Sequence, residues 1–323
     1  MTRHFLKDSD LSPDEQREVL ALALDLEADR FARRPLAGPK TVAVLFDKSS
    51  TRTRVSFATG IAELGGYPLV MEAGSSQLGR GESIADTTRV LTRMASMLVW
   101  RTFGQDRIEE MAAHASVPVI NALTDAYHPC QILADLATIG HLRGGFEAAG
   151  PALAGRVLAY AGDGANNMAH SYLLGGVTAG MHVRIASPAT HAADPAVVSK
   201  ARAIAERTGG SVTLTDDLAA ACEGAHAIAT DTWVSMGHEG QDGRGDATFA
   251  PFQITEQVMR LGDDPLFLHC LPAYRGKEVS AEVIDGPRSA VWVEAEFRLH
   301  AQKALMTWLL EQSGSASAGV GEG

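Results

Sequence analysis

The chain of 323 residues has few cysteines and no long apolar run. Its cysteines, Cys130, Cys222 and Cys270, are odd in number, far apart and without Cys-x-x-Cys spacing, which argues against a disulfide framework and a thiolate zinc site. No apolar segment approaches the ~20 residues that a membrane-spanning helix needs. The first fifteen residues lack the apolar core of a signal peptide. We therefore expect no membrane partner and take the cytoplasm as the default compartment.

Positive charge is also scarce. Lys and Arg number 28 against 39 Asp and Glu, so the formal net charge is −11. This balance argues against general binding to nucleic acid or to an anionic membrane, although a local basic site for a small anion is compatible with it. The 46% hydrophobic and 21% charged residues are ordinary for a globular protein, and the length predicts about two domains.

Apolar segments of strand length alternate with helical patterns along the chain. The first helix is expected to start at Ser12-Pro13-Asp14-Glu15, a capping box with proline at the first helical position, and the last helix is expected over residues 296–310. The predicted strands are residues 41–46, 67–71, 96–100, 117–121, 156–162, 182–187, 211–215, 226–231 and 265–270. Such alternation predicts parallel sheets covered by helices on both faces.

The strand–helix series is interrupted once, at residues 143–155, which are rich in Gly, Ala and Pro and read as a linker. We therefore predict an α/β protein of two doubly wound parallel-sheet domains, residues 1–142 and 156–312, with a cleft between them. The last helix is expected to pack back on the N-terminal domain. Residues 313–323, mostly Gly, Ser and Ala, are expected to form a disordered tail.

The segment from Asp47 to Arg54 (DKSSTRTR) follows a predicted strand and begins a helix. A helix N-terminus offers free N–H groups and the positive end of a dipole, which suit a phosphate. Hydroxyl and guanidinium donors add to it, from Ser50, Thr51, Arg52, Thr53 and Arg54. The segment is not a Walker A loop. A solvated basic helix start with Ser and Thr caps is the alternative interpretation.

A second motif, His128-Pro129-Cys130-Gln131, lies between another strand and helix of the same half. There His128 can donate to a carbonyl oxygen and Gln131 can hold an amide. Taken alone, a His-Pro pair before a helix is usually a turn. Found together in the first of two α/β halves, the two motifs indicate a functional site much more specifically than either motif does alone.

The two motifs resemble the aspartate/ornithine carbamoyltransferase family. Its S-T-R-T-R signature is matched by residues 50–54 and its H-P-x-Q by residues 128–131, and the resemblance covers nearly the whole chain. Residues 231–237 (D-x-x-x-S-M-G) and 269–272 (H-C-L-P) resemble the members that use ornithine. Further matches are Gln77, Arg101, Asn167 and Arg298. One departure is Phe297, where the family's Glu-Asn-Arg has asparagine.

The resemblance implies transfer of the carbamoyl group of carbamoyl phosphate to the δ-amine of L-ornithine. The products would be L-citrulline and phosphate, as in arginine biosynthesis or a urea-cycle-type step. No cofactor or metal is implied, because phosphate is already a good leaving group. The resemblance also implies a homotrimer with shared sites, in which Gln77 reaches in from a neighbouring subunit.

The resemblance assigns roles to residues of both halves. The expected carbamoyl-phosphate ligands are Ser50, Thr51, Arg52, Thr53, Gln77, Arg101, His128, Gln131, Cys270, Leu271 and Arg298. The expected ornithine ligands are Asn167, Asp231, Ser235 and Met236. The glycine-rich segment 237–248 has the composition of a lid over the amine substrate.

Two chemical tasks remain for the catalytic residues. Thr53, Arg101 and His128 are the expected donors to the carbamoyl oxygen as its carbon becomes tetrahedral. The δ-amine must be neutral to attack, and for a lysine-like amine of pKa ~10.4 this costs about 4.6 kcal/mol at pH 7. Cys270 is the candidate proton acceptor, and the phosphate is an alternative that the sequence leaves open.

The motifs of the second half have alternative interpretations. Gly162-Asp163-Gly164 could begin a dinucleotide site, but Asn167 stands where the third glycine is wanted and no acid follows the next strand. Asn166 and Asn167 could simply cap a helix, and Asp231 could be a plain N-cap for the turn that follows it. A carbamoyltransferase for putrescine or N-acetylornithine, or a non-catalytic anion-binding module of the same fold, are the alternative functions.

Overall fold

The computed structural model describes residues 2–72, 81–145, 153–233 and 246–318. The chain forms two compact units, one of Met1–Ala137 with Phe297–Gly323 and one of Thr138–Glu296. Each unit contains an all-parallel sheet, which confirms the predicted pair of α/β domains. Several predicted features lie outside the described residues: Gln77, Ser235, Met236, most of the lid segment and residues 319–323 of the tail.

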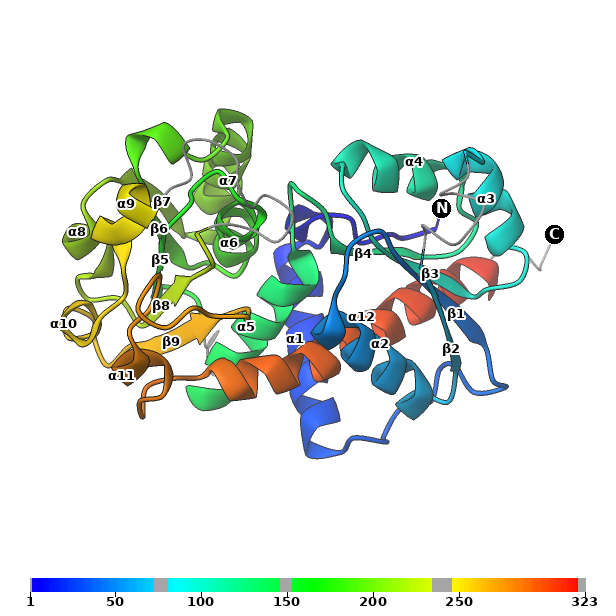
Figure 1. Cartoon of the computed structure of the whole chain (residues 1–323). Helices are drawn as coiled ribbons and strands as arrows, with labels where there is room; N and C mark the ends of the chain where they lie inside the picture. Colours follow the sequence, from blue (N-terminus) through cyan, green and yellow to red (C-terminus); the bar gives the residue numbers. More distant parts are fainter. Residues whose placement is uncertain (1, 73–80, 146–152, 234–245, 319–323) are drawn as a thin grey trace. The chain divides into compact units, whose positions relative to one another are not determined.

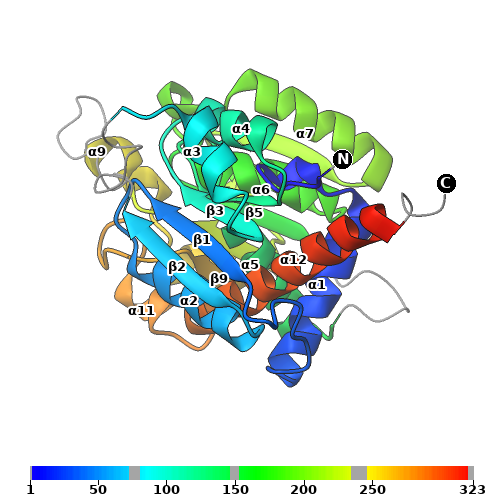
Figure 2. The same ribbon diagram turned by 90° about the vertical axis from the view of Figure 1, so that its right-hand side faces the viewer.

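The first unit contains a four-stranded sheet of order β2-β1-β3-β4. Its strands are β1 (Thr41–Phe46), β2 (Tyr67–Glu72), β3 (Met97–Arg101) and β4 (Val119–Leu123). Figures 1 and 2 show α3 (Ile84–Leu91) and α4 (Gln105–His114) on one face of this sheet and α2 (Thr51–Glu63) on the other. The strands β1, β3 and β4 are almost completely buried, because helices cover both faces.

Three further helices complete the first unit. The helix α1 (Pro13–Ala28) begins with the predicted capping box, in which Ser12 Oγ accepts from the Glu15 N–H at 3.3 Å and Glu15 Oε2 accepts from the Ser12 N–H at 2.8 Å. The helices α5 (Pro129–Leu142) and α12 (Val291–Ala318) each contain a boundary between the units. From Phe297 onward α12 belongs to the first unit, so the last helix packs back as predicted. It continues to Ala318, into the segment expected to be disordered.

The second unit contains a five-stranded sheet of order β7-β6-β5-β8-β9. Its strands are β5 (Val157–Ala161), β6 (His182–Ala186), β7 (Ser211–Thr215), β8 (Ala227–Thr230) and β9 (Leu266–His269). Its helices are α6 (Asn167–Thr178), α7 (Pro195–Thr208), α8 (Leu218–Cys222), α9 (Asp246–Phe249), α10 (Glu256–Met259) and α11 (Ala281–Ile284). Figure 1 shows α6 and α7 on one face of the sheet and α8, α10 and α11 on the other.

Each sheet contains a switch point. This is the place between two neighbouring strands from which the chain adds further strands on opposite sides. In the first unit this point lies between β1 and β3, and in the second between β5 and β8. Because the strands are parallel, the loops after their carboxyl ends meet at one edge of each sheet, where α/β proteins bind their ligands. None of the helices in the described part of the chain combines the length and apolar character needed to cross a membrane.

Candidate active site

The Ser-Thr-Arg-Thr-Arg segment forms the N-terminus of α2, directly after the central strand β1. Ser50 is the N-cap, and its Oγ accepts a hydrogen bond from the Thr53 N–H at 3.3 Å. Thr53 is buried, Arg52 is half-buried and Thr51 is exposed. The cap therefore presents Thr53 to the interior of the first unit, at the positive end of the helix dipole.

Arg54 does not share the environment of its neighbours. Its guanidinium pairs with Glu72 at the end of β2 and lies 4.8 Å from the centre of the Phe46 ring. From its place in the motif, this arginine is expected to be an anion donor. The structure shows instead that Arg54 neutralises a carboxylate at the same edge of the sheet.

Arg298 of α12 reaches the other two motifs of the first unit. It donates to Thr53 Oγ1 at 2.9 Å and to Gln131 Oε1 at 2.6 Å, although 245 residues separate it from Thr53. The Gln131 amide then donates to Asp135 Oδ1 at 2.7 Å. All four side chains are buried, so the STRTR motif, the HPCQ motif and Arg298 form one buried polar cluster.

His128 lies among positive charges. Burial lowers the pKa of His128 well below its usual value, and the guanidinium charges of Arg298, Arg101 and Arg52 lower it further. The imidazole is therefore neutral at physiological pH and keeps one N–H donor. Arg101, at the end of β3, is 7% exposed. Three guanidiniums, of which those of Arg101 and Arg298 are buried, lie beside a neutral donor, and this environment suits a small, multiply charged anion.

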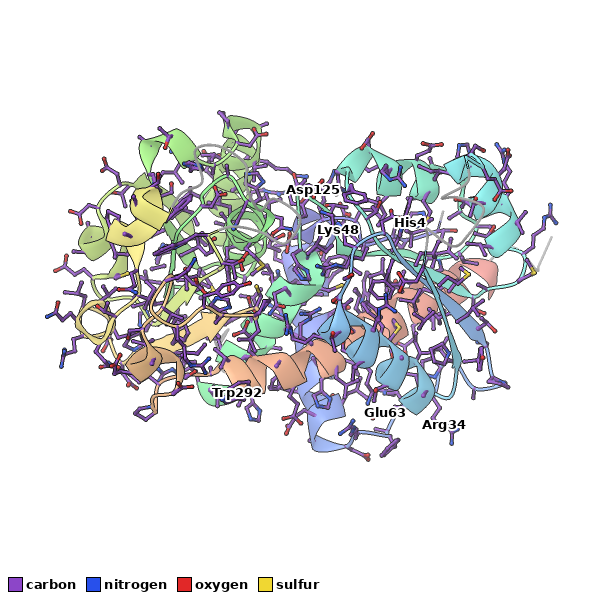
Figure 3. The ribbon with its side chains drawn as sticks, viewed as in Figure 1. His4, Arg34, Lys48, Glu63, Asp125 and Trp292 are labelled. Carbon is purple, nitrogen blue, oxygen red and sulfur yellow. The ribbon has the colours of Figure 1, made fainter. Side chains whose placement is uncertain are left out.

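Lys48 and Asp125 join the two loops that carry these motifs. Lys48 lies in the loop after β1 and forms an ion pair with Asp125, in the loop before His128, and the two side chains lie together in Figure 3. The lysine ammonium also lies 4.8 Å from the centre of the Phe103 ring. The sequence did not predict this contact, because Lys48 and Asp125 lie just before the two motifs and are not part of either one.

In the second unit, Asp231 follows β8 and is 9% exposed. Its Oδ1 accepts from the Thr232 N–H at 2.7 Å, and its Oδ2 accepts from the Asn166 amide at 3.4 Å. Burial raises the pKa of Asp231, against the opposing effects of the His269 charge and the Cys270 hydrogen bond. No lysine or arginine in the described residues pairs with this carboxylate. A cationic ligand would therefore relieve a desolvated negative charge.

Cys270 lies beside Asp231, at the end of the neighbouring strand β9. Its thiol donates to Asp231 Oδ1 across 3.2 Å. The following residue, Leu271, has a φ of 56° and precedes a cis peptide bond to Pro272. The Leu271 N–H donates to His269 Nδ1 at 2.9 Å. Left-handed backbone at a residue with a branched side chain is uncommon and concentrates at functional sites.

Asp231, His269 and Cys270 offer ligand atoms that all lie within 4.8 Å of one another, a spacing that a metal ion could bridge. Other contacts already engage this trio. His269 Nδ1 accepts from Leu271, and its Nε2 lies 3.4 Å from Glu278 Oε1. Cys270 is bonded to Asp231 and His269 to the Leu271 backbone, and we assign the three residues no metal.

The Gly-Asp-Gly-Ala-Asn-Asn turn follows β5. Asn166 caps α6, with its Oδ1 accepting from the Ala169 N–H at 2.8 Å, and Asn167 is the first residue of the helix. A Cβ on Gly164 would lie only 2.7 Å from Ser187 Oγ and from the His191 carbonyl oxygen. This glycine therefore serves close packing of the protein's own loops, which agrees with rejecting a dinucleotide site.

Three remaining residues have structural roles. Burial raises the pKa of the thiols of Cys130 and Cys222 to about 12, so both stay protonated and unreactive. Phe297, which replaces the family's asparagine, is 1% exposed and packs edge-on against His300 at 5.8 Å. An aromatic ring therefore fills the interior beside Arg298.

Comparison with known proteins agrees with the geometry. Residues 3–141 match the carbamoyl-P binding domain, and residues 154–309 the Asp/Orn binding domain, of the aspartate/ornithine carbamoyltransferase family. The chain belongs to this family.

Individual relatives cover almost the whole chain. The ornithine carbamoyltransferase of Clavibacter sepedonicus is 60% identical over 97% of this chain and 100% of its own length. The structure of the Pyrococcus furiosus ornithine carbamoyltransferase matches with a TM-score of 0.88 at 41% identity, covering 95% of this chain and 96% of that one. The anabolic enzyme of Campylobacter jejuni also gives 0.88, at 36% identity over 96% and 99%.

Proposed function

We propose that the protein transfers the carbamoyl group of carbamoyl phosphate to the δ-amine of L-ornithine. A C–N bond forms to the δ-nitrogen, the C–O bond to phosphate breaks, and L-citrulline and phosphate leave. Asp231 is the observation that carries the choice of ornithine, since it is a desolvated carboxylate without a lysine or arginine partner in the described residues. Arginine biosynthesis in the cytoplasm is the setting that we propose on the sequence and the family resemblance.

The first unit binds carbamoyl phosphate in this proposal. Arg52, Arg101 and Arg298 hold the phosphate by charge-assisted bonds, helped by the N-terminus of α2. His128 is neutral, because burial and three neighbouring cations lower its pKa, so it donates one hydrogen bond to the carbamoyl oxygen. Thr53 and Arg101 are the other donors. Losing one such donor typically raises the barrier by about 3 kcal/mol.

The second unit binds ornithine. Asp231 pairs with the α-ammonium group, and Asn167, Ser235 and Met236 complete the amino-acid site. N-acetylornithine has lost the α-ammonium charge, so it cannot pair with Asp231. Putrescine keeps an ammonium at the corresponding position and lacks the α-carboxylate, so it is the groups that would bind this carboxylate, and not Asp231, that discriminate against it. An aspartate-using enzyme would want basic residues at this position. The charge of Asp231 therefore favours ornithine over N-acetylornithine and over aspartate, and the Ser235-Met236-Gly237 motif is the argument against putrescine.

Cys270 is the residue that we propose as proton acceptor for the δ-amine, with the leaving phosphate as the alternative. The neutral thiol donates to Asp231, so Cys270 must first release this proton to solvent, and its thiolate then accepts the proton of the δ-ammonium group. Leu271, with its unusual backbone, is proposed to contact the carbamoyl group.

A citrulline-forming assay tests the proposal. Purified protein is given carbamoyl phosphate with L-ornithine, putrescine or N-acetylornithine side by side, and only ornithine is expected to react quickly. Arg52→Ala is the companion variant, because this half-buried side chain can be removed with little change to the core. It should keep the fold and lose carbamoyl-phosphate binding. Near-normal affinity in Arg52→Ala would count heavily against the assignment.

We also propose a homotrimer with shared sites. The edge strand β2 supports association, because Tyr67 is 57% exposed and Leu69 and Val70 are each 38% exposed. An apolar edge strand offers unpaired backbone groups and apolar surface to another chain. Gln77 lies five residues after this strand in the sequence. Light scattering should give three times the 34.1 kDa chain mass, and a monomer would refute the shared site.

A further inference from the structure

The hydroxyl group of Tyr160 is buried in the centre of the second unit. Tyr160 lies on β5, the middle strand of the sheet, and is 0% exposed. Phenylalanine would fill the same space without a polar group to satisfy, so the buried hydroxyl calls for a partner. It has two: it accepts from Asn166 Nδ2 at 2.8 Å and lies 3.4 Å from the carbonyl oxygen of Asp163, to which it donates.

Asn166 has its whole amide engaged. Its Oδ1 accepts from the Ala169 N–H at 2.8 Å, which determines the side-chain orientation, and its two Nδ2 protons point to Tyr160 and to Asp231 Oδ2. Asn166 is 6% exposed. A simple helix cap needs only the oxygen, so the contacts of the nitrogen are additional to the capping role.

The series of hydrogen bonds from Tyr160 through Asn166 ends at Asp231 Oδ2. In the part of the chain that the structure describes, Oδ2 accepts from Asn166 alone, whereas Oδ1 accepts from Thr232 and Cys270. Burial and the nearby charges of Asp231 and Asp163 raise the pKa of Tyr160 well above its usual value. The phenol therefore stays neutral, and its lone pair remains an acceptor for Asn166.

We propose that Tyr160 and Asn166 are positioning residues for ornithine, which hold Asp231 Oδ2 at the angle needed to receive the substrate's α-ammonium group. This inference rests on the proposed function and adds two residues to it. Neither touches the substrate in this account. The phenol locks the amide, and the amide orients the carboxylate, so both act through Asp231.

Two variants separate this role from packing and capping. Asn166→Ser keeps a residue that caps helices as well as asparagine does and removes the amide donor. Tyr160→Phe keeps the ring and removes the hydroxyl. Tyr172→Phe is the matched control, because Tyr172 is also 0% exposed and packs against Tyr160 with ring centres 5.6 Å apart.

Steady-state kinetics of citrulline formation provides the test. Asn166→Ser and Tyr160→Phe are each expected to raise the KM for ornithine about tenfold, with the KM for carbamoyl phosphate unchanged and melting temperatures near that of Tyr172→Phe. The inference is overturned if ornithine KM matches the control in both variants, or if both substrates lose affinity equally. An inactive wild-type protein would refute the proposed function itself, whereas active protein with unaltered variants refutes only this inference.

Discussion

Lys303 and Glu63 form a buried ion pair between α12 and α2. The Lys303 side chain is 0% exposed, and its ammonium lies 2.8 Å from Glu63 Oε2 and donates also to the Arg30 carbonyl oxygen. Glu63, labelled in Figure 3, lies at the C-terminal end of α2, the helix that has Thr53 in its first turn. The two helices approach closely here, since a Cβ on Gly60 would lie 3.0 Å from Lys303 Cγ.

Replacing Lys303 by methionine should reduce the free energy of unfolding strongly. Methionine replaces most of the buried stem, so the loss comes from leaving a buried carboxylate without its ammonium. Breaking such a pair costs about 3–5 kcal/mol. Glu63 keeps its 2.7 Å contact with Arg30, whose side chain is 45% exposed, so we expect the lower end, about 3 kcal/mol. That is a large share of the ~5–15 kcal/mol typical of a folded domain.

The double variant Lys303→Met/Glu63→Gln provides the sharper measurement. Removing both charges leaves no uncompensated buried ion. The double variant should therefore lose at least about 2 kcal/mol less free energy of unfolding than the two single variants lose together. Urea-induced unfolding of the four proteins at one protein concentration gives this coupling. Additive single effects would refute the reasoning, because they would mean that the pair contributes nothing beyond packing.

Two other predictions concern proton binding. Cys270→Ala should lower kcat and shift its pH profile, because the thiol is the proposed proton acceptor, and an unchanged profile would leave the phosphate in that role. Burial lowers the pKa of His4, His128 and His226, so below pH ~6.5 the unfolded chain binds more protons than the folded one. The free energy of unfolding should therefore fall on acidification, by at most about 1.4 kcal/mol per pH unit from the buried His128 and by less from the more exposed His4 and His226. In His226→Gln, whose native imidazole accepts from the Val157 N–H at 3.0 Å, the slope between pH 6.5 and 5.5 should be shallower. A slope equal to that of the wild type would contradict this prediction.

The sequence was most informative where local chemistry determines structure. Buried parallel strands need apolar runs, so the predicted strand 41–46 and the other predicted strands were found within two residues of their observed ends. The Ser12 capping box and the Ser50 cap were readable because both are interactions between residues three apart. Short helices such as α8 and α11 were missed, since four or five residues do not show a helical period.

The contacts of long charged side chains could not be read in this way. Arg54 lies in the motif that the sequence assigns to an anion, yet its guanidinium pairs with a carboxylate, because Glu72 ends the neighbouring strand β2. Lys48 finds Asp125 for a related reason, since both lie in loops at the carboxyl edge of one sheet. These pairings depend on strand order, which residue spacing alone does not encode.

The same dependence explains why the chain from Tyr160 to Asp231 is visible only in the fold. Strands β5 and β8 are neighbours, and Ala161 is in register with Thr230, so the residues that follow them, the turn with Asn166 and Asp231, meet at the switch point of the sheet. A tyrosine one residue before the end of β5 then lies below the asparagine that caps α6. In sequence, Tyr160 is one more apolar residue in a strand, and Asn166 is one more helix cap. Only the parallel pairing of β5 with β8 gives either of them a connection to the carboxylate that we propose binds ornithine.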